Sequence, residues 1–464
     1  MHKLYYQPEG FWFGDCMPFG KDDKFYLFHQ RDTRKPGPFG EPFGWDLAVT
    51  SDFVHYEDLG VAIPRGMDDE QDQFIFAGSI FAADSKYHAF YTGYNRDYPA
   101  LGKASQVLMH AISDDLVHWQ KSKMELTFNP QPGYDPDDWR DPFVLWDEEN
   151  QEYLLILGAR KLNGKKQING CTVQFRSKDL HNWQFHGDFW SPSIYTMHEM
   201  PDLFKIGEWW YLIISEYSDK NKMVYRMSKS LNGPWVAPVD DAFDGRAYYA
   251  GRTFELNNQR ILFGWVPTKE DDDDQKNFQW GGTFVAHEIF QREDGTLGVK
   301  MPDAVWQAFE DRQEIEPFSL STVDSRAESI LVKGSGTLFS WEADISWDTA
   351  PRSFAVKLFN NDETDEGYQF IFFPGENRYV FEKSPNQPWF QCMNIGLDRP
   401  YSMSDKQTCH IRLIVDDTIA TIYVDGVALN TRMYKKPGET LSVFVTDGQI
   451  RVSNSTFSNS LSAE

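Results

Sequence analysis

Three acidic residues, Asp15, Asp141 and Glu199, each stand 11 or 12 residues before a tyrosine at the centre of a short aromatic strand. This spacing predicts that they share one position of a repeated unit. Carboxyl groups gathered in one pocket raise at least one pKa, because neighbouring like charges oppose each other's ionisation. Glycoside hydrolysis requires a protonated carboxyl beside an ionised one. The three acids are therefore candidate catalytic residues for cleaving a glycosidic bond.

The strands that must position these acids recur along the chain. Five runs qualify, with centres 50 to 66 residues apart: KFYLFHQ, KYHAFYTGY, EYLLILGAR, WWYLIIS and RILFGWV. Each run is short, rich in aromatic and aliphatic residues, and bounded by polar or turn residues, which is typical of a β-strand.

A second signal follows each of the first four strands by about 25 residues. It is a Ser/Thr-x-Asp-apolar turn that ends in an aromatic residue, at positions 50–56, 113–119 and 177–183, with a degenerate copy at 228–235. Ser, Thr and Asp side chains can bond backbone N–H groups in such a turn. A repeat of 50 to 66 residues that holds about four short strands predicts a propeller blade.

Five strand signals predict a five-bladed β-propeller over residues 1–303. The innermost strand of each blade lines the central channel, so equivalent positions from several blades converge on one axial pocket. With 464 residues the all-β chain is too long for one ordinary core, and a second domain is expected.

The pattern of the sequence changes beyond about residue 318. Short strands alternate with Gly, Asn and Asp turns, among them SFAVKLF, YQFIFF, CHIRLIVD, TIATIYVDG, LSVFVTDG and QIRVSNS. This pattern predicts a β-sandwich of two antiparallel sheets over residues 319–464. Residues 304–318 are expected to form a linker, with a short helix in AVWQAFEDRQE.

Charge and composition restrict the partners. A net charge of −25 and a pI near 4.8 repel nucleic acid and anionic membranes, so we expect neither, and a neutral carbohydrate suits the surface. The chain shows no apolar run long enough to span a membrane and no signal peptide, and its four cysteines lack metal-site spacing. We expect a cytoplasmic protein without metal or other cofactor; a homo-oligomer is compatible with the sequence.

The acidic motifs bear a family resemblance. WFGD ending at Asp15 resembles a Trp-Met-Asn-Asp nucleophile motif, RDP around Asp141 matches an Arg-Asp-Pro motif, and EMPD beginning at Glu199 resembles a Glu-Cys acid/base motif. In this order and spacing, the chain is similar to glycoside hydrolase family 32, the β-fructofuranosidases that include invertase, inulinase and levanase. The resemblance covers nearly the whole chain.

The resemblance implies a retaining hydrolase that releases a β-linked furanosyl unit, most often fructose, from sucrose-like oligosaccharides or fructans. It implies Asp15 as nucleophile, Glu199 as acid/base and Asp141 as the group that stabilises the transition state. It also implies a set of sugar-binding residues: Trp12, Gln30, Trp45, Phe76, Ser79, Arg140, Tyr249 and Trp280.

The chain departs from the family at the nucleophile, where Gly14 replaces the Asn before Asp15 and Cys16 replaces the Pro after it. Met200 replaces the Cys after the acid/base. These changes indicate a divergent subgroup whose sugar or linkage differs from sucrose. Three alternatives stay open: a fructosyltransferase on the same site, an inverting arabinofuranosidase or xylosidase, and a sugar-binding protein without turnover.

Overall fold

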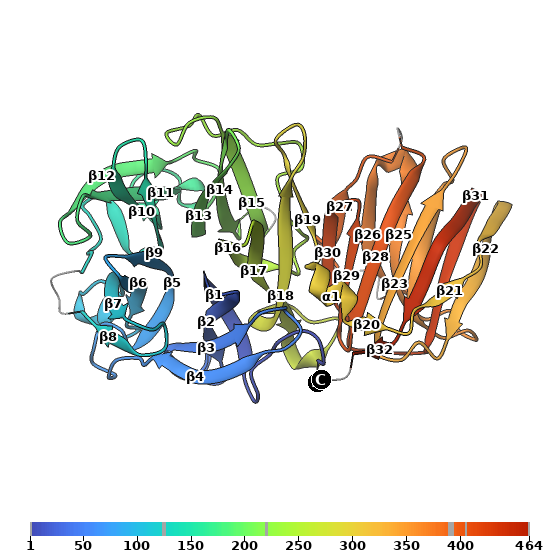
Figure 1. The fold of residues 1–464 in the computed structure, drawn as a ribbon, viewed down its shortest axis with the longest axis horizontal. Helices are drawn as coiled ribbons and strands as arrows, with labels where there is room; N and C mark the ends of the chain where they lie inside the picture. The colour runs from blue at the N-terminus through green and yellow to red at the C-terminus, as the bar shows by residue number, and fades with distance from the viewer. Residues whose placement is uncertain (1, 123–126, 219–220, 388–393, 404–405, 463–464) are drawn as a thin grey trace.

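The chain forms two all-β units that lie side by side along the longest axis of the molecule (Figure 1). The computed structural model describes residues 2–122, 127–218, 221–387, 394–403 and 406–462. Among these residues, the regular structure is almost entirely strand, and no helix has the length and apolar character needed to cross a membrane.

The first unit is a five-bladed propeller whose strands follow the chain order within each blade. Blade one contains β1 (Trp12–Lys21), β2 (Lys24–Asp32), β3 (Trp45–Thr50) and β4 (Glu57–Ile63). Blade two contains β5 (Phe74–Ala83), β6 (Lys86–Tyr94), β7 (Gln106–Ser113) and β8 (Trp119–Lys121). Blade three contains β9 (Tyr134–Asp147), β10 (Glu152–Lys161), β11 (Gly170–Ser177) and β12 (Trp183–Trp190).

Blade four contains β13 (Glu199–Ile206), β14 (Trp209–Glu216) and β15 (Lys222–Ser228). Blade five contains β16 (Tyr249–Leu256), β17 (Gln259–Lys269), β18 (Phe278–Gln291) and β19 (Leu297–Lys300). Short 3-10 helices lie in the connections: η1 (Tyr98–Leu101), η3 (Lys166–Ile168) and η4 (Glu270–Asp272). The propeller closes where Phe13 of β1 pairs with Gly282 of β18, which joins blades five and one into one sheet.

The second strand of each blade explains the aromatic-aliphatic runs. The central residues of β10 and β14 are all buried, because neighbouring blades cover both faces of each sheet. A strand buried on both faces carries a continuous apolar run and not an alternating one. The five repeated runs of the sequence therefore correspond to the second strands of five blades, which confirms the predicted propeller.

The predicted turn motif is also present. In blade one, Thr50 Oγ1 accepts from the Phe53 N–H at 2.9 Å, and Asp52 Oδ1 accepts from the Val54 N–H at 2.8 Å. The closing aromatic, Tyr56, donates to the Phe53 carbonyl at 3.1 Å. Blades two and three repeat these bonds around Asp115 and Asp179.

The second unit is a sandwich in which one long strand runs through both sheets. β31 (Thr440–Ser458) pairs with β24 (Ser353–Asn360) over its first half and with β23 (Leu338–Ser346) over its second half. The remaining strands are β22 (Phe318–Lys333), β25 (Gly367–Phe373), β26 (Arg378–Ser384), β27 (Asp398–Pro400), β28 (Thr408–Asp416), β29 (Ile419–Val424) and β30 (Val427–Arg432), with the 3-10 helix η5 (Pro374–Glu376).

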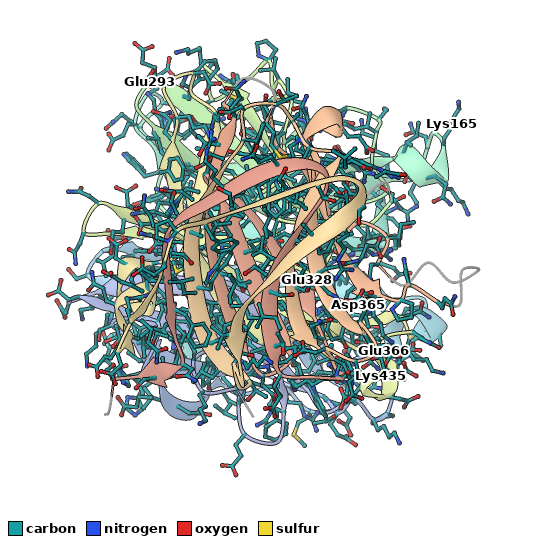
Figure 2. All side chains as sticks on the ribbon, turned by 90° about the vertical axis from the view of Figure 1, so that its right-hand side faces the viewer. Lys165, Glu293, Glu328, Asp365, Glu366 and Lys435 are labelled. Atoms are coloured by element: carbon teal, nitrogen blue, oxygen red, sulfur yellow. The ribbon has the colours of Figure 1, made fainter. Side chains whose placement is uncertain are left out.

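Two of the predicted sandwich strands are therefore one strand. The sequence places a turn between LSVFVTDG and QIRVSNS, whereas β31 continues through this point, where residues 323–325 of β22 bulge opposite Asp447. β22 follows β31 across both sheets and lies at the end of the sandwich remote from the propeller (Figure 2). There Arg326 forms ion pairs with Glu328 and Asp365.

The stretch predicted as a linker contains a helix, as expected, and two short strands. α1 (Asp303–Gln307) is followed by β20 (Phe309–Glu310) and β21 (Gln313–Ile315). β20 pairs with β32 (Ser460–Leu461), and β21 pairs with β31. The connection is thus anchored to the sandwich by backbone hydrogen bonds.

Buried polar groups join the two units. Asp244, which precedes blade five, accepts from the Asn430 backbone N–H at 2.8 Å and lies 2.9 Å from His287 Nε2. His287 Nδ1 in turn lies 2.7 Å from the Tyr423 hydroxyl. Asp244 and His287 come from the propeller and the other two from the sandwich, so satisfying these groups requires both units.

The described cysteines are unpaired. Cys16, Cys171 and Cys409 are buried free thiols, and Cys392 lies outside the described residues.

Candidate active site

The inner strand of every blade carries a β-bulge at the same place. In each strand, pairing with the second strand of the blade slips by one residue, which re-aims the neighbouring side chains and is a recurrent feature beside active sites. The slips lie between Phe13 and Cys16, Phe76 and Gly78, Arg140 and Phe143, Glu199 and Asp202, and Tyr249 and Arg252.

The three acids occupy successive positions of this bulge and not one shared position, which corrects the prediction from spacing. Glu199 is the last paired residue before the bulge, Asp141 is the first residue within it, and Asp15 is the second. The discrepancy has two causes: the acid precedes the tyrosine by 11 residues in blade one and by 12 in blades three and four, and the tyrosines differ in register. Tyr26 and Tyr153 pair with the third residue after the one at which pairing resumes beyond the bulge, whereas Tyr211 pairs with the second. Equal distance along the chain therefore does not give equal register.

The structure nevertheless brings the acids together. Asp15, Asp141 and Glu199 line one cavity of about 420 Å³ at the propeller axis. Five of the predicted sugar-binding residues line it as well: Gln30, Phe76, Arg140, Tyr249 and Trp280.

Three predicted sugar-binding residues lie elsewhere. Trp45 is fully buried on the third strand of blade one, where its indole N–H donates to the Phe76 carbonyl at 3.1 Å. Ser79 lies beyond the bulge of β5 and lines a second cavity at the other end of the inner strands. Trp12 packs under the Arg34 guanidinium, 4.6 Å from the ring centre, beside a depression that the sandwich helps to line.

Asp15 is held between blades one and five. The Trp265 indole N–H donates to Asp15 Oδ1 at 3.0 Å, and the Trp280 side chain also bonds this carboxyl. Burial, and after it the nearby charge of Asp141, raises the pKa of Asp15 to about 8, although both indole donors oppose the rise. Asp15 is therefore a carboxyl whose ionisation depends on its hydrogen-bond donors.

Asp141 is fixed by its backbone. Its φ of 64° is rare for a residue other than glycine and marks a backbone held by its surroundings. The Asp141 N–H donates to Thr92 Oγ1 at 2.9 Å, and its Oδ2 accepts from the Met200 N–H at 3.0 Å. Burial raises the pKa of Asp141 to about 6, while Arg140 opposes this rise. The bulges of blades three and four thus orient the carboxylate together.

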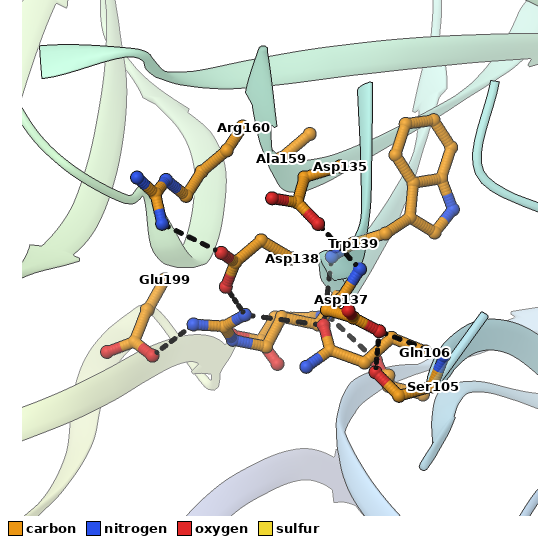
Figure 3. A network of polar contacts seen from close by, with 12 residues as sticks. Ser105, Gln106, Asp135, Asp137, Asp138, Trp139, Ala159, Arg160 and Glu199 are labelled. Carbon is orange, nitrogen blue, oxygen red and sulfur yellow. Dashed lines mark hydrogen bonds and ion pairs between the residues drawn. The ribbon is translucent and has the colours of Figure 1, made fainter. Parts of the chain in front are cut away.

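Glu199 has a donor for each oxygen. Arg140 Nη2 lies 2.9 Å from Oε1, and the Tyr249 hydroxyl donates to Oε2 at 2.6 Å. Arg140 is itself held by Asp138 at 2.8 Å, and Asp138 is held by Arg160 at 3.0 Å, a chain visible in Figure 3. The Glu199 carboxyl group is therefore oriented from both sides.

Gly14 has a steric role beside Asp15. A Cβ atom at this position would lie 2.6 Å from the Trp280 ring and 3.0 Å from Gln30 Cβ. The absence of a side chain lets the indole approach the backbone of β1 and line the cavity. Trp280 thus fills the space into which a side chain at position 14 would project.

Trp265 and Arg252 approach the acids, but the sequence analysis identified neither them nor several lining residues of the cavity, among them Phe39, Tyr94 and Asp138. Trp265 lies within the run RILFGWV, which we assigned only to a strand, although its pairing with Tyr249 places it at the bulge of blade five. Arg252 is a fully buried cation three residues after Tyr249, in an inner strand whose other charged residue, Glu255, is exposed. A charge inside a strand of the propeller interior was the available signal.

This geometry defines the class of protein. A five-bladed propeller presents three carboxylates with distinct environments at an axial cavity, and one carboxyl pair of this kind can supply both an acid and a nucleophile. No group of three His, Cys, Asp or Glu residues in the described ranges has the geometry to hold a metal ion. The protein is a glycoside hydrolase.

Comparison with known proteins gives the family. Residues 5–296 match the glycosyl hydrolases family 32 N-terminal domain, and the chain belongs to this family. It is 25% identical to a levanbiose-producing levanase of Bacillus subtilis over 92% of this chain and 84% of the relative. It is 21% identical to a sucrose-6-phosphate hydrolase of Escherichia coli over 92% of this chain and 88% of the relative.

Solved structures share the fold over the whole length. A sucrose-6-phosphate hydrolase from Lactobacillus gasseri superposes with a TM-score of 0.79 at 18% identity, covering 99% of this chain and 93% of that one. Fructan 1-exohydrolase IIa from Cichorium intybus superposes with a TM-score of 0.79 at 15% identity, covering 100% and 98%. The propeller-and-sandwich architecture is thus the one these structures share.

Proposed function

We propose that this protein is a retaining β-fructofuranosidase that releases fructose from a neutral fructoside, with Asp15, Asp141 and Glu199 as its catalytic residues. The observation that carries the proposal is the convergence of these three acids on one cavity, at three successive positions of the repeated bulge. Family membership supplies the reaction class, and the relatives named as levanase and fructan exohydrolase support a fructoside as substrate.

In the first step, Asp15 attacks the anomeric carbon C2 while Glu199 transfers its proton to the departing glycosidic oxygen. The C–O bond to the leaving group breaks as the bond to the Asp15 carboxylate forms. The leaving group departs as an alcohol, and a covalent fructosyl–enzyme ester remains. Tyr249 and Arg140 keep the Glu199 carboxyl pointed at the cavity during this step.

In the second step, Glu199 removes a proton from water, and the resulting hydroxide attacks C2. The ester bond breaks, Asp15 is restored as a carboxylate, and fructose leaves with its original anomeric configuration. Asp141 accepts hydrogen bonds from ring hydroxyls, and its negative charge stabilises the oxocarbenium-like transition state in both steps.

The charge of the cavity favours a neutral sugar over a phosphorylated one. Arg140 is the cation among the lining residues, and it is already held by Glu199 and Asp138. Asp137 and Asp138 add negative charge to the lining. A phosphate would meet these carboxylates, and the lining residues that the structure describes offer no free cation to bind it. We therefore favour a neutral fructoside, although some relatives are named sucrose-6-phosphate hydrolases.

We propose that residues 1–303 form the catalytic unit and that residues 319–464 form an accessory sandwich, which supports the propeller through the buried Asp244–His287 contacts. We also propose a cytoplasmic location. Buried free thiols such as Cys16 and Cys171 are usual in a reducing compartment.

Product release from a panel tests the proposal: sucrose, 1-kestose, inulin, levan, difructose anhydrides and aryl arabinofuranosides. We expect free fructose from at least one fructoside, with the activity lost in Asp15→Asn and Glu199→Gln. Release of a pentose would contradict fructose as the released sugar but would leave the assignment of the active site in place. Fructosyl transfer to sugar at high substrate concentration would indicate a transferase. Sugar binding without any product would indicate a protein that has lost catalysis.

A further inference from the structure

Arg252 of β16 lies behind the catalytic acids in the propeller interior. Its side chain is 1% exposed. Nη1 donates to the Pro201 carbonyl at 2.8 Å, and Nη2 donates to the Asp141 carbonyl at 3.4 Å. The guanidinium therefore bonds the bulge of blade four just after Glu199 and the bulge of blade three at Asp141 itself.

No carboxylate of the described residues lies within ion-pair distance of Arg252, and its Nε has no hydrogen-bond partner among them. Burial of an unpaired cation costs several kcal/mol unless nearby charges compensate. The carboxylates that act on it are Asp202, Asp141 and Asp15, in order of decreasing influence. Two of these three are the acids of the active-site cavity.

We propose that Arg252 is a positioning residue whose fixed positive charge favours the ionised forms of Asp15 and Asp141 in the free enzyme. This inference rests on the proposed function, because it assigns Arg252 to the same reaction. It adds a residue that touches no substrate and acts from behind the cavity.

The charges around the acids support this role. The groups that act on Asp141 are Arg140, Glu199 and Arg252, and those that act on Asp15 are Asp141 and Glu199. Arg140 is committed to Glu199 and Asp138 by short ion pairs. Arg252 is then the guanidinium still able to offset the charge of Asp15 and Asp141, and it lowers the pKa of Asp141.

The other side of Arg252 faces a second cavity of about 510 Å³ with a mostly apolar lining. The charged residues in that lining are Lys205, Glu255 and Arg260. Arg260 forms its own ion pair with Glu255 at 2.8 Å. Arg260 therefore provides a matched control, because it is a partly buried arginine of the same cavity that makes no contact with the acids.

The pH dependence of kcat/KM on a fructoside cleaved by the parent tests the role. We expect Arg252→Met to move the acid limb up by about one pH unit. Its activity should fall about tenfold more at pH 6 than at pH 8.5. Arg252→Lys should move the acid limb of kcat/KM part of the way back towards that of the parent. Arg260→Met should change kcat/KM by the same factor at every pH. A uniform loss in Arg252→Met would show that the residue only supports packing.

Thermal unfolding tests the same coupling without any activity, so it also decides the case in which the parent cleaves nothing on the panel. At pH 7.5, Asp141→Asn should raise Tm by more in an Arg252→Met background than in the parent, because the relieved charge there has lost its counter-charge. This additional rise in Tm should vanish at pH 4, where Asp141 is neutral in the parent and in Arg252→Met. Equal shifts in both backgrounds at pH 7.5 would overturn the inference.

Discussion

The Trp265 indole in blade five donates a 3.0 Å hydrogen bond to the Asp15 carboxylate in blade one. This bond crosses the closure of the propeller, where the backbones of the two blades meet through the single pair of Phe13 and Gly282. The orientation of the nucleophile thus depends on a contact between residues 250 positions apart in the sequence.

Trp265→Phe removes a donor that stabilises ionised Asp15. The pKa of Asp15 should rise above about 8, and the acid limb of kcat/KM, which lies between the pKa values of about 6 for Asp141 and about 8 for Asp15, should move to higher pH. We expect kcat/KM at pH 7 to fall about tenfold. Trp183→Phe, which removes an indole bond to a turn carbonyl, is the control and should leave the profile unchanged.

Asp15→Asn should abolish activity and stabilise the protein. Because the folded-state pKa of Asp15, about 8, lies above the unfolded value, folding favours the neutral carboxyl, and stability is lost as pH rises from about 4 to about 8. In Asp15→Asn, the uncharged amide removes this loss of stability with rising pH. The free energy of unfolding of the variant minus that of the parent should grow by up to roughly 1.4 kcal/mol per pH unit. Thermal melts at pH 4, 6 and 8 measure this difference, and a constant difference would contradict the raised pKa.

Tyr249→Phe leaves one Glu199 oxygen without its hydroxyl donor. The acid/base is then less firmly oriented, and we expect kcat to fall 10- to 100-fold, roughly the range for a positioned proton-transfer group, with KM changed less. Tyr248→Phe is the adjacent control. Its hydroxyl bonds the Leu262 and Val285 carbonyls in the core, so stability should fall while kcat is retained. Equal kcat losses in both variants would assign Tyr249 to packing.

Gly14→Ala should disturb the nucleophile by displacing the Trp280 ring, since the new methyl group would lie 2.6 Å from it. We expect a loss of about 1 to 3 kcal/mol in stability and a fall in kcat/KM. The stability cost should be smaller in a Trp280→Ala background, which removes the clash, and a double-mutant cycle of urea unfolding measures the coupling. Gly375→Ala, with open space around the new Cβ, is the control for a harmless methyl group. Additive effects of Gly14→Ala and Trp280→Ala would contradict the steric role.

The fold was largely predictable because its signals are local. Each blade carries its own strand run, and blades one to three also carry a Ser/Thr-x-Asp turn, so the repeat could be counted along the chain. The course of β31 was not predictable in this way. Its Asp447-Gly448 pair has the composition of a hairpin turn, yet both halves of the strand pair with β22, a partner more than 100 residues away.

The sequence predicted the site residues that a motif identifies individually. It did not predict residues whose distance from the cavity depends on strand register. Asp15, Asp141 and Glu199 reach the cavity, but Ser79 does not, because it follows the bulge that turns its strand away. Trp265 and Arg252 reach the acids from other blades, and no local pattern links them to a carboxylate. Such contacts follow from the closure of the ring and only the folded chain displays them.

The repeated bulge is present in every blade, whether or not the blade carries one of the three acids. Blades two and five keep it although their bulge positions carry Ala77 and Ala250 in place of an acid. The backbone therefore keeps the bulge, and one or two residues of it line the cavity in each blade, whichever side chains occupy it. For an engineer, a mutant library restricted to these positions would alter the reacting groups while the hydrogen-bonded frame stays constant. The same property would let a duplicated blade acquire a new role by one point mutation at a time.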